Sequence, residues 1–285
     1  MNDRSQTPEL EADGAGEEER KSNRELWEIW TELHEGSSFY DLEGFRAGGS
    51  SLNPLELGEV GDVAGKSLLH LQCHFGLDTL SWARLGARVT GVDFSERAVR
   101  LAGHLAAELE IPARFIRSDL YELSGQLEDR FDIIFTSYGV LWWLPDLRPW
   151  ANLIAEMLAP GGVFYIAEFH PFLNLLDDDG KGPIGSYFSD KGPIRYEATG
   201  SYAAPDAGEP HECFGWAHSI SEILAVLDDA GLQLEFFREH AFSPYDCYPF
   251  LEADGAGRYI IRGTSGGVPM VFSLRARRKD SEDAG

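Results

Sequence analysis

The sequence has few cysteines, and it contains no long hydrophobic run. Its three cysteines, Cys73, Cys213 and Cys247, are too few and too scattered for a disulfide framework, which fits a reducing compartment. No stretch reaches the roughly 18 consecutive apolar residues of a membrane span, and no charged, apolar and small-residue leader opens the chain. The sequence therefore predicts no membrane association and a cytoplasmic location.

Basic side chains are also scarce. The chain has 24 Lys and Arg against 48 Asp and Glu, which gives a formal net charge of −24 and an isoelectric point near 4.6. Such a charge repels the phosphate backbone of DNA and RNA. A nucleic-acid partner is therefore not expected, and the short basic run 275–279 is interpreted as a solvated last strand and tail.

The length of 285 residues fits one α/β domain with appendages. Residues 1–22 are acidic and hold almost no large apolar side chain, so we expect a disordered tail. A single domain over 23–279 and a short tail at 280–285 complete the expected organisation. Asn23 is the expected cap of a first helix, which either packs on the core or lies as a lid over a pocket. Residues 44–65 are rich in glycine and are expected to be irregular.

The most informative stretch is Lys66 to Asp93. It reads as a buried strand (Ser67–Gln72), a tight loop (Cys73–Leu77), a helix opening near Asp78 and a second strand (Arg88–Phe94). This βαβ pattern implies a parallel sheet, in which ligands bind beyond the carboxyl ends of the strands. Asp93 lies at such an end and could accept both hydroxyls of a ribose. The stretch therefore predicts a nucleoside pocket.

Strands and helices continue to alternate after this unit. The expected order is a helix at 96–110, strands at 113–118 and 131–138, a helix stopped by Pro160, a strand at 163–169, a helix that begins with the capping box Ser219–Glu222, and strands at about 232–240 and 268–277. Regular patterning fails between His170 and His218. Such a long structureless segment is unusual in a compact domain. We expect a substrate cover there, and short strands within it remain an alternative.

Several motifs then occur in a specific order: HLQCHFG after the first strand, GVDFS at the end of the second, SDLY after the third, FDIIFTSYGVLWWLPDL around the fourth and LAPGGVFYIAEFHP around the fifth. Together they resemble the class I S-adenosylmethionine-dependent methyltransferases, and most closely the bacterial small-molecule type that carries LHLQCHFG in the first unit. The resemblance implies a Rossmann-like, doubly wound α/β fold whose seven-stranded, mostly parallel sheet has an antiparallel last strand. It also implies methyl transfer from S-adenosylmethionine to a small-molecule acceptor, with release of S-adenosylhomocysteine.

The resemblance assigns cofactor contacts residue by residue. The first loop would hold the methionine portion, Asp93 the ribose, Asp119 the adenine amino group, and the end of the fourth strand the sulfonium. Tyr138, Trp142 and Trp143 are candidates for cation–π contact with that sulfonium. The expected cofactor-binding residues are Gln72, Cys73, His74, Gly76, Asp93, Phe94, Asp119, Leu120, Ser137 and Tyr138.

The first loop departs from the family pattern. His70 occupies a position that is usually acidic, and Gln72 and His74 occupy positions that are usually glycine; Gly76 alone keeps the expected type. Glycine allows close backbone approach to a ligand. We therefore expect the methionine end to be held differently, with Gln72 or His74 in direct contact with its carboxylate or amine.

A weak nucleophile such as a hydroxyl needs a base to take its proton. His170 follows the fifth strand at the ligand end of the sheet and is the preferred candidate, and His74, Glu168 and His240 are weaker ones. The group near 70–74 lies in a strand and in the loop where the cofactor is expected, and the group near 211–218 lacks a convincing paired spacing, so no metal is expected.

Two other classes of protein compete with a transferase. A dehydrogenase would need G-x-G-x-x-G where residues 72–77 read QCHFGL. A non-catalytic protein that binds or senses S-adenosylmethionine stays open, since a pocket does not prove a reaction. The acceptor atom and the oligomeric state are not readable from the sequence, although aromatic residues of the expected cover favour a flat or apolar acceptor: Tyr187, Tyr196, Tyr202, Phe214 and Trp216.

Overall fold

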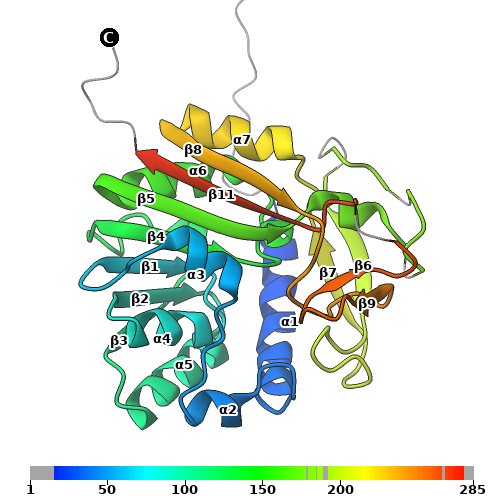
Figure 1. The fold of residues 1–285 in the computed structure, drawn as a ribbon, viewed down its shortest axis with the longest axis horizontal. Coiled ribbons are helices and arrows are strands. Elements are labelled where there is room, and N and C mark those ends of the chain that lie inside the picture. The colour runs from blue at the N-terminus through cyan, green and yellow to red at the C-terminus, as the bar shows by residue number, and fades with distance from the viewer. Residues whose placement is uncertain (1–15, 178, 184, 189–191, 265–266, 279–285) are drawn as a thin grey trace, which may run out of the picture.

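The central feature of the computed structural model is a twisted sheet whose strands run in the order β3-β2-β1-β4-β5-β11-β8 (Figure 1). The structure describes residues 16–177, 179–183, 185–188, 192–264 and 267–278. Within these residues the sheet has seven strands. Their bounds are β1 Ser67–Leu71, β2 Arg88–Asp93, β3 Ala113–Arg117, β4 Phe131–Ser137, β5 Leu158–Phe169, β8 Leu232–His240 and β11 Val271–Arg278.

The direction of the strands agrees with the prediction. β1 to β5 pair in parallel, and β11 inserts between β5 and β8 antiparallel to both. The strand order reverses between β1 and β4, so the chain leaves these two strands toward opposite edges. Such a reversal opens a crevice at the carboxyl ends of the strands. The predicted seven-stranded, mostly parallel sheet with a reversed last strand is confirmed.

Helices cover both faces of the sheet (Figure 1). α6 (Leu147–Met157) and α7 (Ile220–Asp229) pack on one face around the fully buried Trp150, and α4 (Leu77–Arg84) packs on the other around Trp82. α5 (Glu96–Glu108) is capped at its N-terminus by Ser95, whose hydroxyl accepts a hydrogen bond from the N–H of Ala98. In the described part of the chain, no helix is both long enough and apolar enough to span a membrane.

The first helix begins earlier than predicted. α1 spans Glu17–Glu35, so the expectation of disorder is wrong for residues 17–22, while residues 1–15 and 279–285 lie outside the described residues. Three glutamates in the first turn favour a helix N-terminus electrostatically. Asn23 is not a cap: it is buried within α1, where its side chain pairs with both backbone groups of Phe214 at 2.8 and 2.9 Å.

The segment 44–65 is not irregular as expected, because it contains most of α2 (Leu42–Arg46) and all of α3 (Pro54–Val60). Pro54 occupies the first turn of α3, and the carboxylate of Glu56 accepts a hydrogen bond from the N–H of Asn53 at 2.8 Å. An Asn-Pro-x-Glu sequence is a recognisable helix start. α3 packs over the same sheet face as α4 and brings Glu56 to the interior.

Short strands occupy part of the segment 170–218, which was one of the two alternatives for it. A 3-10 turn (Pro171–Leu175) follows β5, and β6 (Ile194–Ala198) pairs antiparallel with β7 (His211–Gly215). A second small hairpin, β9 (Leu251–Ala253) with β10 (Tyr259–Ile261), lies in the connection before β11 and was not predicted. Figure 1 shows α1 between the sheet and the β6–β7 hairpin.

Candidate functional site

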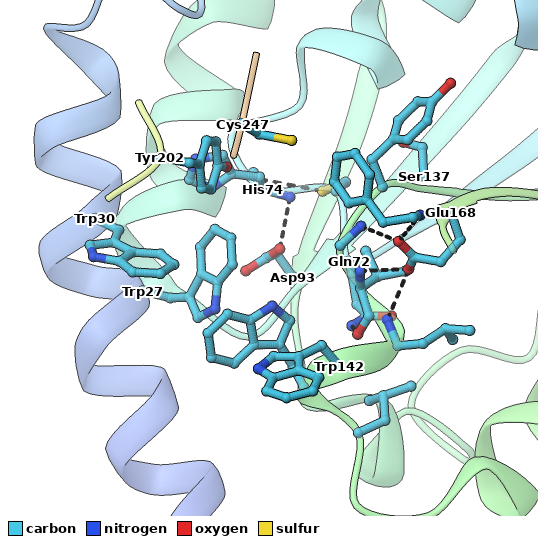
Figure 2. A pocket seen from close by; sticks show the side chains of 18 of the residues that line it. Trp27, Trp30, Gln72, His74, Asp93, Ser137, Trp142, Glu168, Tyr202 and Cys247 are labelled. Carbon is cyan, nitrogen blue, oxygen red and sulfur yellow. Dashed lines mark hydrogen bonds between the residues drawn. The ribbon is translucent and has the colours of Figure 1, made fainter. Parts of the chain in front are cut away.

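A cavity of about 690 Å³ lies at the carboxyl ends of β1, β2, β4 and β5. All ten residues predicted to bind the cofactor line it. Figure 2 shows Trp27 and Trp30 of α1 on one side, Ser137 and Glu168 on the other, and Asp93 with His74 between them. The cavity therefore joins the two strand ends that the sequence indicated with a helix far from them in the chain.

Asp93 ends β2 and presents its carboxylate to this cavity. Its Oδ2 accepts a hydrogen bond from the N–H of His74 at 2.7 Å, and its Oδ1 accepts one from the N–H of Ser95 at 2.9 Å. Burial raises the pKa of this carboxyl to about 6, while the two amide donors act in the opposite direction. Each oxygen keeps a further lone pair. Asp93 can therefore accept hydrogen bonds from two adjacent hydroxyls.

The loop after β1 keeps the backbone conformation that glycine favours, although Gln72 and His74 stand at two of its positions. Gln72 has a φ of 55° and His74 a φ of 49°, in the left-handed region, as does Gly76 at 80°. This conformation costs a non-glycine residue about 1–2 kcal/mol. A Cβ on Gly76 would also lie 2.6 Å from the ring of Phe115. The loop path is thus retained, and Gln72 and His74 add polar side chains to the cavity.

Three polar side-chain atoms at this loop have no hydrogen-bond partner among the described residues. They are His70 Nε2, Gln72 Oε1 and His74 Nδ1, and all three residues line the cavity. The other end of each side chain is held: Gln72 Nε2 donates to the carbonyl of Val140 at 3.0 Å, for example. Buried polar atoms are normally paired. The unpaired atoms indicate that a polar ligand completes this part of the cavity.

Two histidines link the loop to α1 and to the segment before β7. His34 Nδ1 lies 2.9 Å from His74 Nε2, and His34 Nε2 lies 2.9 Å from the hydroxyl of Ser201. Burial lowers the pKa of His34 to about 3 and lowers that of His74 well below its ordinary value. Both rings are therefore neutral at physiological pH. This chain fixes the orientation of His74, whose Nδ1 is left for a ligand.

α1 forms one wall of the cavity through Arg20, Asn23, Trp27 and Trp30. Arg20 lies 3.4 Å and Arg24 3.6 Å from the carboxylate of Asp119, the residue expected near an adenine amino group. Of the two interpretations of this helix, the structure supports the one that places it over the pocket. The face that α1 turns toward the cavity cannot be read from the helix sequence alone, because it depends on contacts with Asp119 and with β7.

The sequence interpretation missed Asp78, which lines the cavity, and Glu56, which is buried and bonded to the lining residue Tyr138. Ser137 donates a hydrogen bond to Asp78 Oδ2 at 3.1 Å, and Tyr138 donates one to Glu56 Oε2 at 3.0 Å. Burial raises the pKa of Glu56 to about 7, with a smaller contribution from the nearby Asp78. The helix start at Asn53 would have indicated Glu56. Tyr202, which was expected in the cover, reaches the cavity from a loop together with Tyr40 and Tyr245, and no sequence signal marks Tyr245.

The structure does not bring His170 and His240 into the cavity. His170 Nδ1 accepts a hydrogen bond from the N–H of Phe172 at 3.1 Å, and its Nε2 lies 3.1 Å from Glu239. His240 Nε2 lies 3.0 Å from the hydroxyl of Ser273. Both nitrogens of His170 are thus engaged away from the cavity. The geometry does not support His170 or His240 as the base.

Glu168 lines the cavity, but its carboxylate is used by the backbone. It accepts hydrogen bonds from the N–H groups of Gly139, Val140, Leu141 and Phe169. A carboxylate with these donors holds the loop after β4 in place. This arrangement corrects the prediction of a catalytic Glu168 to a positioning one. Within the described residues, no group of three or more His, Cys, Asp or Glu side chains is arranged to hold a metal ion.

Comparison with known proteins gives the class of this site. Residues 68–162 match the model of a methyltransferase domain. A ubiquinone biosynthesis O-methyltransferase of Cronobacter sakazakii is 27% identical over 184 residues, which are 63% of this chain and 72% of the relative. These matches assign residues 68–162 to a methyltransferase domain.

Solved structures share the fold. An S-adenosylmethionine-dependent methyltransferase of Clostridium acetobutylicum has a TM-score of 0.55 at 14% identity and covers 90% of this chain and 99% of its own. Another, from Mesorhizobium loti, has a TM-score of 0.52 at 19% identity, with 79% and 96% covered. At these identities the likeness concerns the architecture alone.

The cofactor of the class is S-adenosylmethionine, and the residues of the cavity fit it. Asp93 offers two acceptors for ribose hydroxyls, and the unpaired atoms of Gln72 and His74 offer partners for an amino acid carboxylate or amine. Phe94 and Leu120 line the same cavity and offer apolar surface for an adenine ring. These residues would hold the cofactor, which supplies a methyl group on a sulfonium.

The raised pKa of Asp93 predicts that cofactor affinity falls at acidic pH, which we call the acid limb of the binding profile. Because burial raises the pKa to about 6, the carboxylate is ionised above this pH and gains a proton below it. A protonated carboxyl is a poorer acceptor for ribose hydroxyls. We expect the affinity for S-adenosylhomocysteine to be constant at high pH and to fall by up to about tenfold per pH unit below about pH 6.

Calorimetric titrations across this window measure the effect. The control is Asp93→Asn, whose amide does not titrate: it should bind more weakly, with no acid limb. An unchanged limb in this variant would assign the titration to another group.

Proposed function

We propose that this protein transfers a methyl group from S-adenosylmethionine to a small aromatic molecule that carries no negative charge. The observation that carries the proposal is the composition of the cavity beyond the cofactor residues. Aromatic side chains dominate it: Phe39, Tyr40, Phe169, Tyr202, Tyr245, Tyr248 and Phe250. Flat rings offer large apolar contact area to an aromatic acceptor.

The charges of the cavity support an acceptor without negative charge. Of the described lining residues, Asp41, Asp78, Asp93, Asp119 and Glu168 are acidic, and Arg20, which contacts Asp119, is the one Lys or Arg. An anionic acceptor would leave water without gaining a cation as partner. The net charge of −24 also speaks against nucleic acid. The relative from C. sakazakii is named as an O-methyltransferase, which favours a hydroxyl as acceptor atom.

Methyl transfer from a sulfonium is an in-line displacement, so alignment of the two reactants supplies much of the rate. In this proposal Ser137 and Tyr138 border the reacting centre, and the loop 72–76 fixes the cofactor against them. α1 and the described parts of the segment 170–218 would form the cover that excludes water. Of the five aromatic residues expected in that cover, Tyr196, Tyr202 and Trp216 line the cavity, whereas Tyr187 and Phe214 do not. The free cysteines support a cytoplasmic location.

The test has two stages. Calorimetry should first show binding of S-adenosylmethionine and S-adenosylhomocysteine in the micromolar range, about −8 kcal/mol. Release of S-adenosylhomocysteine is then measured with a matched pair of acceptors, dihydroxybenzyl alcohol and dihydroxybenzoate, which differ in one carboxylate. Turnover of the alcohol in preference to the acid is the expected result. Preference for the acid would contradict the proposed acceptor class, and failure to bind either cofactor form would contradict the function.

A further inference from the structure

Two tyrosine–glutamate pairs join the short helix α3 to the sheet. Tyr138 Oη donates a hydrogen bond to Glu56 Oε2 at 3.0 Å, and Tyr165 Oη donates one to Glu59 Oε2 at 2.9 Å. Tyr138 follows β4 and lines the cavity, whereas Tyr165 lies within β5 and does not line it. The two pairs share their chemistry and their helix, and they differ in whether they reach the cavity.

The two glutamates also differ in their charged partners. Glu59 forms an ion pair with Arg238 at 2.7 Å. Glu56 is 0% exposed and forms no ion pair with a described residue; besides Tyr138, it accepts hydrogen bonds from the backbone N–H and the side-chain amide of Asn53, at 2.8 and 3.1 Å. A neighbouring cation favours the ionised form of a carboxylate. Without one, Glu56 can take up a proton more readily than Glu59.

The backbone fixes the Tyr138 side chain at the wall of the cavity. Its φ of 42° lies in the left-handed region, which costs a non-glycine residue about 1–2 kcal/mol. Its N–H donates to the carbonyl of Ala167 at 2.8 Å, and Glu168 accepts from the N–H groups of the three residues that follow. Its ring packs on Phe169 and Tyr245, which both line the cavity. Such strain persists where the surroundings hold a functional group in place.

A hydroxyl acceptor must lose its proton as it is methylated, and a positioned side chain can take that proton. We propose that Tyr138 is a catalytic residue that passes the proton of the acceptor hydroxyl to Glu56; we call these two residues the relay. Burial and the charge of Glu56 raise the pKa of Tyr138 well above its ordinary value, so its hydroxyl keeps a proton that it can donate. The inference rests on the proposed function, which supplies a hydroxyl acceptor beside Tyr138.

The step conserves atoms and electrons. The acceptor oxygen forms a bond to the methyl carbon as the carbon–sulfur bond breaks, and the electron pair of that bond passes to sulfur. The acceptor's proton moves to Tyr138 Oη while the Tyr138 proton moves to Glu56 Oε2. Because Glu56 is fully buried, its proton returns through Tyr138 to water in the cavity after the products leave.

The relay predicts a pH profile for kcat. Burial raises the pKa of Glu56 to about 7, so the carboxylate can accept a proton above this pH and already carries one below it. With cofactor and acceptor saturating, kcat should fall by up to about tenfold per pH unit below about pH 7. Glu56→Gln should lack this fall, because an amide does not titrate. That variant separates Glu56 from the other ionisable groups around it, which are Asp78, Glu59, Tyr138, Tyr165 and Tyr245.

The experiment measures turnover of dihydroxybenzyl alcohol by the full-length protein and four variants. Glu56→Gln keeps an acceptor oxygen but cannot take up a proton, and Tyr138→Phe keeps the ring but removes the hydroxyl. Each should lower kcat by about 100-fold or more at neutral pH, with KM and the affinity for S-adenosylhomocysteine close to the wild-type values. The matched controls are Tyr165→Phe and Glu59→Gln, the pair outside the cavity, which should leave kcat unchanged.

Infrared spectroscopy of the complex with S-adenosylhomocysteine gives a second readout, which does not depend on turnover. The carbonyl stretch of a protonated buried carboxyl should appear in the wild type as the pH falls through about 7. This band should be absent from Glu56→Gln, shifted in Tyr138→Phe and kept in Glu59→Gln. Thermal unfolding checks that each variant is folded, and Tyr138→Phe tests the relay alone if Glu56→Gln does not fold.

Other results overturn the proposal. Wild-type kcat in a folded Tyr138→Phe or Glu56→Gln would remove the relay and leave the methyltransferase function intact. An equal loss of kcat in the two control variants would show that both pairs only hold α3 against the sheet. A wild-type protein that does not bind S-adenosylhomocysteine, or does not methylate the alcohol, would instead be the failure of the proposed function, and the relay would fall with it.

Discussion

Asp93→Ala should weaken the binding of S-adenosylhomocysteine by about 100-fold or more. We propose that the Asp93 carboxylate accepts hydrogen bonds from both hydroxyls of a ribose, while its other lone pairs accept the N–H groups of His74 and Ser95. Hydrogen bonds to a charged group contribute about 1.5–3 kcal/mol each, so the loss of two accounts for a change of this size. Calorimetric titration measures it directly.

The control is Asp129→Ala, which removes an exposed carboxylate paired with Arg114 at 3.0 Å and should leave affinity unchanged. Asp93→Ala also removes the acceptor for two backbone N–H groups, so its folding must be checked by circular dichroism and thermal unfolding. A folded variant that binds as tightly as the wild type would show that Asp93 does not hold the ribose.

Glu168→Ala should destabilise the protein by about 3 kcal/mol or more, because it leaves several buried N–H groups without an acceptor. The carboxylate is 4% exposed and accepts from Val140 at 2.8 Å, Leu141 at 3.1 Å and Phe169 at 2.6 Å, besides Gly139. Each unsatisfied buried group costs about 1–3 kcal/mol. Denaturant unfolding gives the free energy change, and Glu168→Gln, which keeps an acceptor oxygen, should recover part of it.

Glu239→Ala is the matched control: its half-exposed carboxylate pairs with His170, and the expected change is about 1 kcal/mol or less. The same comparison separates the two roles considered for Glu168. If Glu168→Ala kept the stability of the wild type and lost turnover, the residue would be catalytic and its interpretation as a positioning group would be wrong.

The contrast between Asp93 and His170 shows what position along a strand can predict. Both follow a strand at the ligand end of the sheet, yet Asp93 reaches the cavity and His170 does not. Asp93 closes a central strand beside the point where the strand order reverses. His170 follows β5 and turns at once into a 3-10 segment, whose first N–H its ring caps. Local capping decided its orientation, and the strand pattern carries no information on that choice.

The order of residues 17–22 has a related cause. Residues 17–22 are too polar to predict a packed helix, but α1 is held by pairs between side chains and distant backbone, such as Asn23 with Phe214 and Trp30 with Gly200. These partners are more than 150 residues away in the sequence. Helix propensity depends on residues that are close in the sequence, so it cannot predict contacts of this range.

The sequence by itself determined the sheet, the order of the alternating elements and ten residues that line the cavity, because periodic burial and the ends of parallel strands follow from the local pattern. Only the tertiary structure decided what surrounds them. It brought Asp78, Glu56 and the loop tyrosines together, turned His170 away and placed α1 over the cavity. The physical reason is that a binding wall is assembled from segments distant in the chain, and their meeting depends on packing and hydrogen bonds that exist only once the sheet has formed.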